Sequence, residues 1–85
     1  MKVYRRPFPK AVAGTIDKYH YDLENKEFTL SFTQGEDDHT DTVIGTPFEI
    51  EKVTVDGKER KGTFKNNELT LKTKPGKHTV VVKVK

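Results

Sequence analysis

Several residue types and patterns are missing from this 85-residue sequence, and each absence narrows the choice of fold. There is no cysteine, so no disulfide can hold the chain together. No apolar run approaches the roughly 18 residues that a transmembrane helix needs. Residues 1–9 lack the apolar stretch of a secretory signal peptide. Helical spacing of apolar residues is also absent, so we expect one small domain, residues 1–85, held by packing and strand hydrogen bonds.

Charge is plentiful but unevenly spread along the chain. The formal net charge is +3, and 34% of the residues are charged. Residues 1–16 carry four cations and residues 58–85 carry nine cations against two acids, whereas residues 22–41 carry seven acids against one lysine. A nucleic-acid interface gathers its cations on one stripe. The distribution therefore favours a mixed sheet surface and argues against a nucleic-acid partner.

Alternation of apolar and polar residues predicts β-strands. Residues 28–32 read Phe-Thr-Leu-Ser-Phe, which places the three apolar side chains on one face. Residues 16–21 are rich in β-branched and aromatic residues and form a predicted hairpin with that strand. Residues 79–84 alternate around three inward valines at positions 80, 82 and 84. Apolar residues at 48, 50, 53 and 55 change parity, which indicates a bulge near Glu51-Lys52.

Turn signals separate these strands. Asp56-Gly57 suits a type I′ turn, and we expect further hairpin turns at Asn66-Asn67 and at residues 74–77, which read Lys-Pro-Gly-Lys. Residues 34–41 are acidic and without apolar residues, so they predict an exposed loop. Seven or eight short strands at this spacing indicate an all-β fold, an immunoglobulin-like antiparallel β-sandwich formed by residues 15–85.

The most unusual stretch is Pro7-Phe8-Pro9, followed by small residues up to Thr15. Two prolines remove two amide donors, so this part cannot be a central strand. One interpretation is an edge segment tucked over the sandwich. The other is that residues 1–14 form an extended docking segment for a neighbouring domain. Its apolar anchors would be Tyr4, Phe8 and Val12, and its polar rim Arg5 and Arg6.

Residues 6–15, Arg-Pro-Phe-Pro-Lys-Ala-Val-Ala-Gly-Thr, closely resemble a junction sequence of family 5 glycoside hydrolases of the endoglycoceramidase and cellulase-like type. There it joins the catalytic barrel to a C-terminal β-sandwich. Tyr21-Asp22 and residues 27–32 resemble the first hairpin of that sandwich, whereas residues 42–48 depart from it. The resemblance implies a non-catalytic accessory domain that packs against and braces a (β/α)8 barrel. It also implies a secreted or extracellular parent protein.

Catalytic and metal-binding chemistry is not predicted within this chain. The two catalytic glutamates of such hydrolases belong to the barrel. The carboxylates present here fall on exposed strands and in the loop of residues 36–41, where nothing apolar raises a pKa. That loop matches no calcium pattern, and His20, His39 and His78 lack zinc spacing, so we interpret them as exposed polar residues. We expect no catalytic residue, metal or cofactor.

Sugar binding defines the alternative function, a stand-alone carbohydrate- or glycolipid-binding module. Tyr19 and Tyr21 lie two residues apart and so on one side of a strand, which makes them the candidate carbohydrate contacts. The basic C-terminal strands would complete the contact surface. The competing interpretation of the two tyrosines is packing in the core or against another domain.

Overall fold

A computed structural model describes residues 6–85, which form nine strands in two antiparallel sheets and no helix. The four-stranded sheet has the order β1-β4-β8-β7, formed by β1 (Phe8–Ala11), β4 (Thr42–Gly45), β8 (Glu68–Leu71) and β7 (Thr63–Lys65). The five-stranded sheet has the order β2-β3-β9-β5-β6, formed by β2 (Thr15–Asp22), β3 (Glu27–Gln34), β9 (Gly76–Val84), β5 (Ile50–Val55) and β6 (Lys58–Glu59). The predicted all-β sandwich is confirmed; β6, with two residues, is the shortest of its nine strands.

The core lies between the two sheets and contains the side chains that alternation had placed there. Phe28 pairs with Val82 and Leu30 with Val80, and all four are fully buried. Ile44 and Leu69, also paired and buried, cover them from the four-stranded sheet. Burying each such side chain stabilises the fold by about 1.5–3 kcal/mol. The interlocked faces fix the register, because a slip by one residue would turn every one of them outward.

Most local signals in the sequence are confirmed. Asp56 and Gly57 both have positive φ, at 53° and 83°, and Asn66 and Asn67 likewise, at 54° and 62°. These are the two hairpin turns of β5–β6 and β7–β8. The register of β5 against β9 shifts between Ile50 and Lys52, where the bulge was expected.

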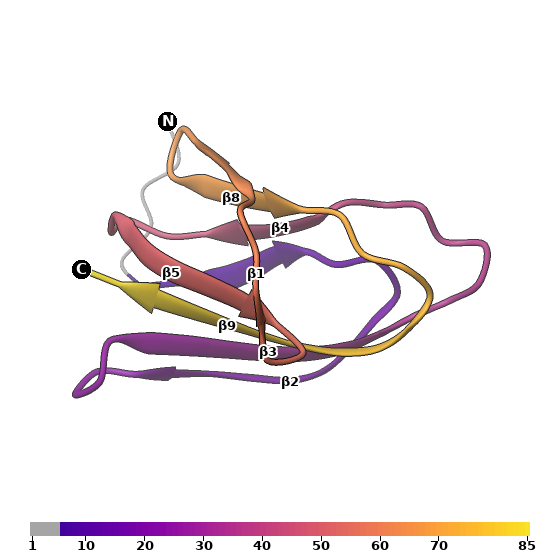
Figure 1. Ribbon diagram of the computed structural model, residues 1–85, viewed down its shortest axis with the longest axis horizontal. Helices are drawn as coiled ribbons and strands as arrows, with labels where there is room; N and C mark the ends of the chain where they lie inside the picture. Colours follow the sequence, from indigo (N-terminus) through magenta and orange to yellow (C-terminus); the bar gives the residue numbers. More distant parts are fainter. Residues whose placement is uncertain (1–5) are drawn as a thin grey trace.

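Two local predictions are wrong. Residues 74–77 do not close a hairpin, because β8 belongs to the four-stranded sheet and β9 to the five-stranded one, so this turn carries the chain between layers. Gln34 is not part of the exposed loop but ends β3 and is 4% exposed. Its amide donates to the carbonyl oxygen of Asp38 at 2.7 Å and accepts from the Thr73 hydroxyl. This contact ties the projecting acidic loop, at the right of Figure 1, to the β8–β9 connection.

The sandwich has two edges at which the chain changes sheet. Residues 12–14 join β1 to β2 at one edge, and residues 60–62 join β6 to β7 at the other. Figure 1 shows the second crossing as the orange segment that runs across the near side of the molecule. These two edges position the surfaces described next.

Candidate functional site

The predicted docking segment forms an edge strand of the four-stranded sheet. Tyr4 and Arg5 lie outside the described residues, and Arg6 is exposed. Within residues 6–85, β1 pairs with β4 and has no strand on its other side, as expected for a proline-rich strand. Pro7 is buried, whereas Phe8 is half-buried and so keeps part of its ring at the surface.

Phe8 lies on the outer face of its sheet. It is paired with Gly45, and the next pair joins Pro9 to Ile44, whose side chain is fully buried between the sheets. Because side chains alternate along a strand, Phe8 and Gly45 face away from the core. On this face Lys10 forms an ion pair with Glu68 at 2.6 Å. The outer face beside β1 therefore combines an aromatic ring with a paired charge.

Val12 to Gly14 carry the chain from β1 to β2. Val12 is half-buried and packs against the core of this same domain, and Ala13 is fully buried. Gly14 has a φ of +108°, and a β-carbon there would overlap the backbone oxygen of Thr33. The small residues thus permit a close crossing between the two sheets.

Tyr19 and Tyr21 both lie on the core side of β2, since they pair with Leu30 and Phe28. Tyr21 is half-buried and stacks on Phe48, with ring centroids 6.2 Å apart and ring planes 22° apart. Tyr19 is 56% exposed and contacts the ring of Phe28 at a tilt of 47°. Of the two candidate sugar contacts, Tyr19 offers the open ring and Tyr21 packs within the domain.

Exposed apolar side chains gather along the same edge. Within residues 6–85, the exposed large apolar side chains are Ile16, Tyr19, Leu23 and Phe64. The first three lie on β2 or in the turn that follows it, and β2 is an edge strand. We call Ile16 and Tyr19, which both lie on the core side of β2, the β1–β2 surface. Sequence reasoning found Phe8 and Tyr19 but missed Ile16, because an alternating pattern does not show how far a side chain of an edge strand is covered.

A second cluster joins the β5–β6 turn to the β8–β9 connection. His78 contacts the Asp56 carboxylate through Nδ1 at 2.7 Å and the Lys74 carbonyl oxygen through Nε2 at 2.5 Å. The other Asp56 oxygen accepts from the backbone N–H of Thr79. Interpreting His78 as an exposed residue was therefore wrong: its side chain is 14% exposed and packs on Phe32. In the structure His78 contacts two acceptors, the Asp56 carboxylate and the Lys74 carbonyl oxygen, and the spacing of these residues in the sequence gave no sign of either contact.

This cluster shifts both pKa values. Burial lowers the pKa of His78, but hydrogen bonds to Asp56 and to the Lys74 carbonyl outweigh it, so the pKa is raised overall. The hydrogen bond from His78, with that from the Thr79 amide, lowers the pKa of Asp56. Both nitrogens of His78 face acceptors, which favours the imidazolium form.

The described part of the chain contains no group of three His, Asp or Glu side chains arranged to hold a metal ion. None of the residues described by the structure forms a helix long and apolar enough to cross a membrane. A groove lies at the β6–β7 edge, at the opposite ends of both sheet orders from β1 and β2.

The two antiparallel sheets place residues 6–85 among the β-sandwich domains. A family model described as "Glycoside hydrolase family 5 C-terminal domain" matches residues 6–85. The chain belongs to this family, as the resemblance of its first third predicted. A search of curated proteins and one of solved structures found no match.

Proposed function

We propose that this domain is a non-catalytic accessory unit that packs beside the (β/α)8 catalytic barrel of its parent glycoside hydrolase and braces it. Membership of the C-terminal domain family supports the association with a catalytic domain. The extracellular location expected for the parent protein belongs to the same proposal. Surfaces between domains of one chain typically bury about 600–1,500 Å².

The observation that carries the proposal is the concentration of exposed apolar side chains on the β1–β2 surface. Ile16 is 40% exposed and Tyr19 56% exposed, although both point toward the core side of β2. An uncovered apolar edge is costly in water and is typical of a surface that another domain covers. Arg6 is exposed just before β1, and Lys10 of β1 forms an ion pair with Glu68 of β8; polar groups of this kind are typical of the rim of an interface.

A double variant of the parent hydrolase tests this function. We expect Ile16→Ser with Tyr19→Ser to lower the temperature at which barrel activity is lost on heating, because the brace no longer holds. Phe64→Ser is the matched control, since Phe64 is 39% exposed on the opposite edge. Equal inactivation temperatures for the double variant and the wild type would contradict the proposal. So would an equal loss in the Phe64 variant.

A further inference from the structure

The β8–β9 connection, residues 72–75, is held on one side by His78. The Lys74 carbonyl oxygen lies 2.5 Å from Nε2 of His78, and Nδ1 of the same ring lies 2.7 Å from the Asp56 carboxylate in the β5–β6 turn. The other oxygen of that carboxylate accepts from the Thr79 backbone N–H at 2.9 Å, so Asp56 is fixed against β9. The His78 ring therefore joins the β8–β9 connection to a second segment that is itself anchored.

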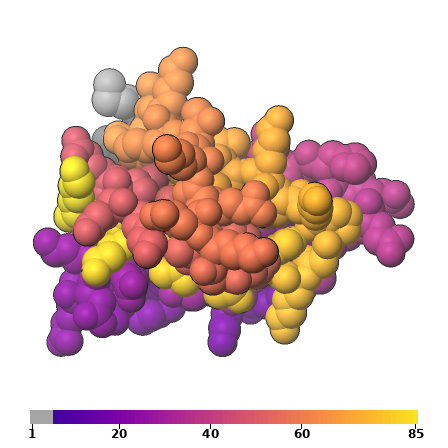
Figure 2. All heavy atoms as spheres, in the orientation of Figure 1, coloured from indigo at the N-terminus to yellow at the C-terminus, as the bar shows by residue number. Residues whose placement is uncertain are grey.

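On its other side the connection contacts the acidic loop, residues 35–41, through Gln34. The Thr73 hydroxyl donates to the side-chain oxygen of Gln34, and the side-chain nitrogen of Gln34 donates to the Asp38 carbonyl oxygen at 2.7 Å. Figure 2 shows the atoms of the loop, magenta at the right, beside the gold atoms of the connection. Because Gln34 is only 4% exposed, water does not readily replace a partner that its side chain loses. Movement at Thr73 is therefore passed on to the loop.

His78 can satisfy both of its acceptors only while it is protonated. An imidazolium has an N–H on each nitrogen, whereas a neutral imidazole has one N–H and one acceptor nitrogen. The ionised Asp56 carboxylate forms the stronger, charge-assisted bond, so we expect the single remaining proton on Nδ1. The lone pair of Nε2 then faces the Lys74 carbonyl oxygen, which is also an acceptor. Deprotonation thus turns an attractive contact with the connection into a repulsive one.

The charged groups that act on His78 keep their charge while it titrates. Asp56 acts on it from the β5–β6 turn and Arg60 from the crossing between β6 and β7, while the apolar ring of Phe32 packs on it from β3. The segment of His78 itself adds two exposed lysines, Lys74 and Lys77. The pKa of Asp56 is lowered from 3.8, and the arginine side chain does not lose its proton in proteins. Of Asp56, Arg60 and His78, only His78 therefore changes its charge between pH 5 and 9.

From these contacts we propose that His78 is a pH-dependent switch that controls the acidic loop. Protonated His78 holds Lys74, and the connection then holds the loop through Thr73 and Gln34. Neutral His78 releases Lys74, and the bonds of Gln34 to Thr73 and to Asp38 open more often. The switch goes beyond the bracing function and does not rest on it, because none of these residues belongs to the β1–β2 surface.

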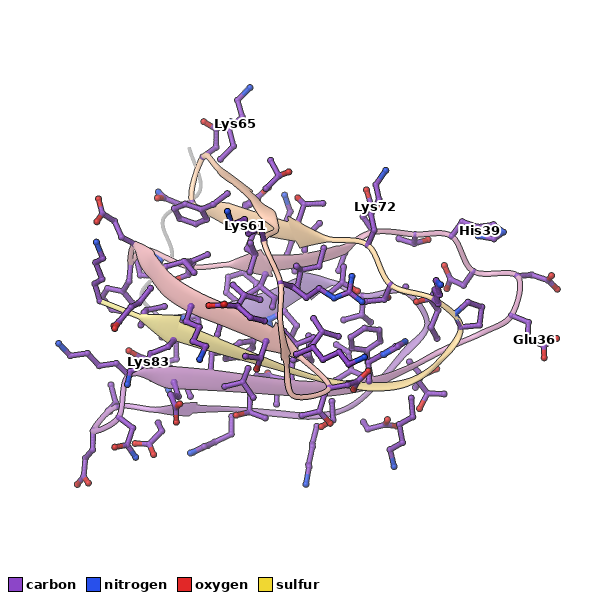
Figure 3. The ribbon with its side chains drawn as sticks, viewed as in Figure 1. Glu36, His39, Lys61, Lys65, Lys72 and Lys83 are labelled. Atoms are coloured by element: carbon purple, nitrogen blue, oxygen red, sulfur yellow. The ribbon has the colours of Figure 1, made fainter. Side chains whose placement is uncertain are left out.

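NMR titration of the 85-residue chain from pH 5 to 9 tests the switch. The loop has a histidine of its own, His39, which Figure 3 labels at the right. Its titration would also shift the loop resonances. The experiment therefore uses the double variant His20→Gln with His39→Gln, in which His78 is the single remaining histidine.

We expect the ring nitrogens of His78 to be both protonated at low pH, and Nδ1 alone to be protonated at high pH. The side-chain amide of Gln34 and the backbone amide of Asp38 should shift with the same midpoint as the ring. Exchange of the Gln34 side-chain amide with water, corrected for its intrinsic pH dependence, should rise about fivefold across that midpoint, as expected for the loss of one hydrogen bond.

Thr73→Val separates the switch from a direct electrostatic effect of His78 on the loop. This substitution removes the hydroxyl that reaches Gln34 and keeps the shape of the side chain. His78 should titrate as before in this variant, whereas the loop amides should no longer follow it. Thr79→Val is the matched control, because Thr79 is next to His78 but its hydroxyl contacts Ser31 instead. The loop amides of this control should still follow the ring.

Thr73→Ser keeps the hydroxyl and should keep the coupling between ring and loop. Three results would overturn the proposal: loop amides that do not shift at the midpoint of His78, a neutral ring with its proton on Nε2, or unchanged coupling in Thr73→Val. The first two are measured without any substitution at Thr73, so they decide the matter even if the valine variant does not fold.

Discussion

At both edges of the sandwich the chain changes sheet within three residues, and each crossing has a glycine next to a neighbouring strand. The two edges differ in the lengths of their strands and in the side chains that they expose. At one edge β1 has four residues and β2 has eight, and Ile16 and Tyr19 of β2 are exposed. At the other edge β6 and β7 have two and three residues, so neither closes the gap between the sheets. One edge thus presents exposed apolar side chains, and the other presents a groove.

The largest expected loss of stability comes from a substitution in the first crossing, residues 12–14. Gly14→Ala would place a β-carbon against the Thr33 backbone at a φ of +108°, so neither space nor backbone conformation accepts it. We expect a loss of about 3 kcal/mol in the free energy of unfolding, measured by urea denaturation. Gly35→Ala is the matched control, because a β-carbon there meets nothing within 4 Å. A loss of less than about 1 kcal/mol for Gly14→Ala would show that the crossing can relax.

A smaller effect is expected at the second crossing. Gly62 has no positive φ, so Gly62→Ala meets crowding without backbone strain. The leucine ends near it can move, but the Thr70 carbonyl belongs to β8 and cannot move cheaply. We expect a loss of about 1–2 kcal/mol in the same denaturation experiment. If this variant loses more stability than Gly14→Ala, the second crossing is the more tightly constrained one and our comparison of the edges is wrong.

The smallest effect concerns the contact between His78 and Asp56, beside the second edge. The raised pKa of His78 makes its contribution complete below pH 6.5, the ordinary histidine value, and lost as pH rises through the raised pKa. The lowered pKa of Asp56 makes its contribution complete above 3.8 and lost as pH falls through the lowered pKa. We expect the contact to stabilise the fold most between these limits. The contact contributes less than about 1 kcal/mol to the free energy of unfolding, because the Asp56 side chain is 47% exposed.

His78→Gln removes the titrating group while keeping a polar side chain. Denaturant unfolding from pH 5 to 9 should show that the free energy of unfolding of the wild type exceeds that of the variant by less and less as pH rises. Charged groups near His78 include Asp56 and Arg60, and Arg60 opposes protonation. A constant difference between the two proteins across this range would mean that His78 does not act through its charge.

Local features of this fold were predictable because local residues determine them. Asp56-Gly57 and Asn66-Asn67 are residue pairs that favour the positive φ of a two-residue hairpin turn, and alternation identifies which valines of β9 face inward. Pairing between distant strands was not predictable in the same way. The turn at residues 74–77 has the same residues whether it closes a hairpin or crosses between sheets, so the sequence alone did not distinguish the two.

Among the candidate site residues, too, those marked by local sequence could be predicted, and those brought together by distant strands could not. Phe8 could be found because prolines mark an edge strand, and Tyr19 because of its spacing from Tyr21. The groove could not be found, since it depends on Phe64, Ile50 and Leu69 meeting from three separate strands. Nor could the acceptors of His78 be found, because Asp56 lies 22 residues before it in the chain.

The position of β9 has a consequence for how the domain is made. This strand is the last of the nine in the described chain, yet it occupies the middle of its sheet, between β3 and β5. During synthesis, β3 and β5 therefore each lack their pairing with β9 until residues 76–84 have left the ribosome. The sheet is therefore completed late and by pairing between strands far apart in the sequence, which is typical of slow folding. Without β9, this sheet would separate into two hairpins, β2–β3 and β5–β6.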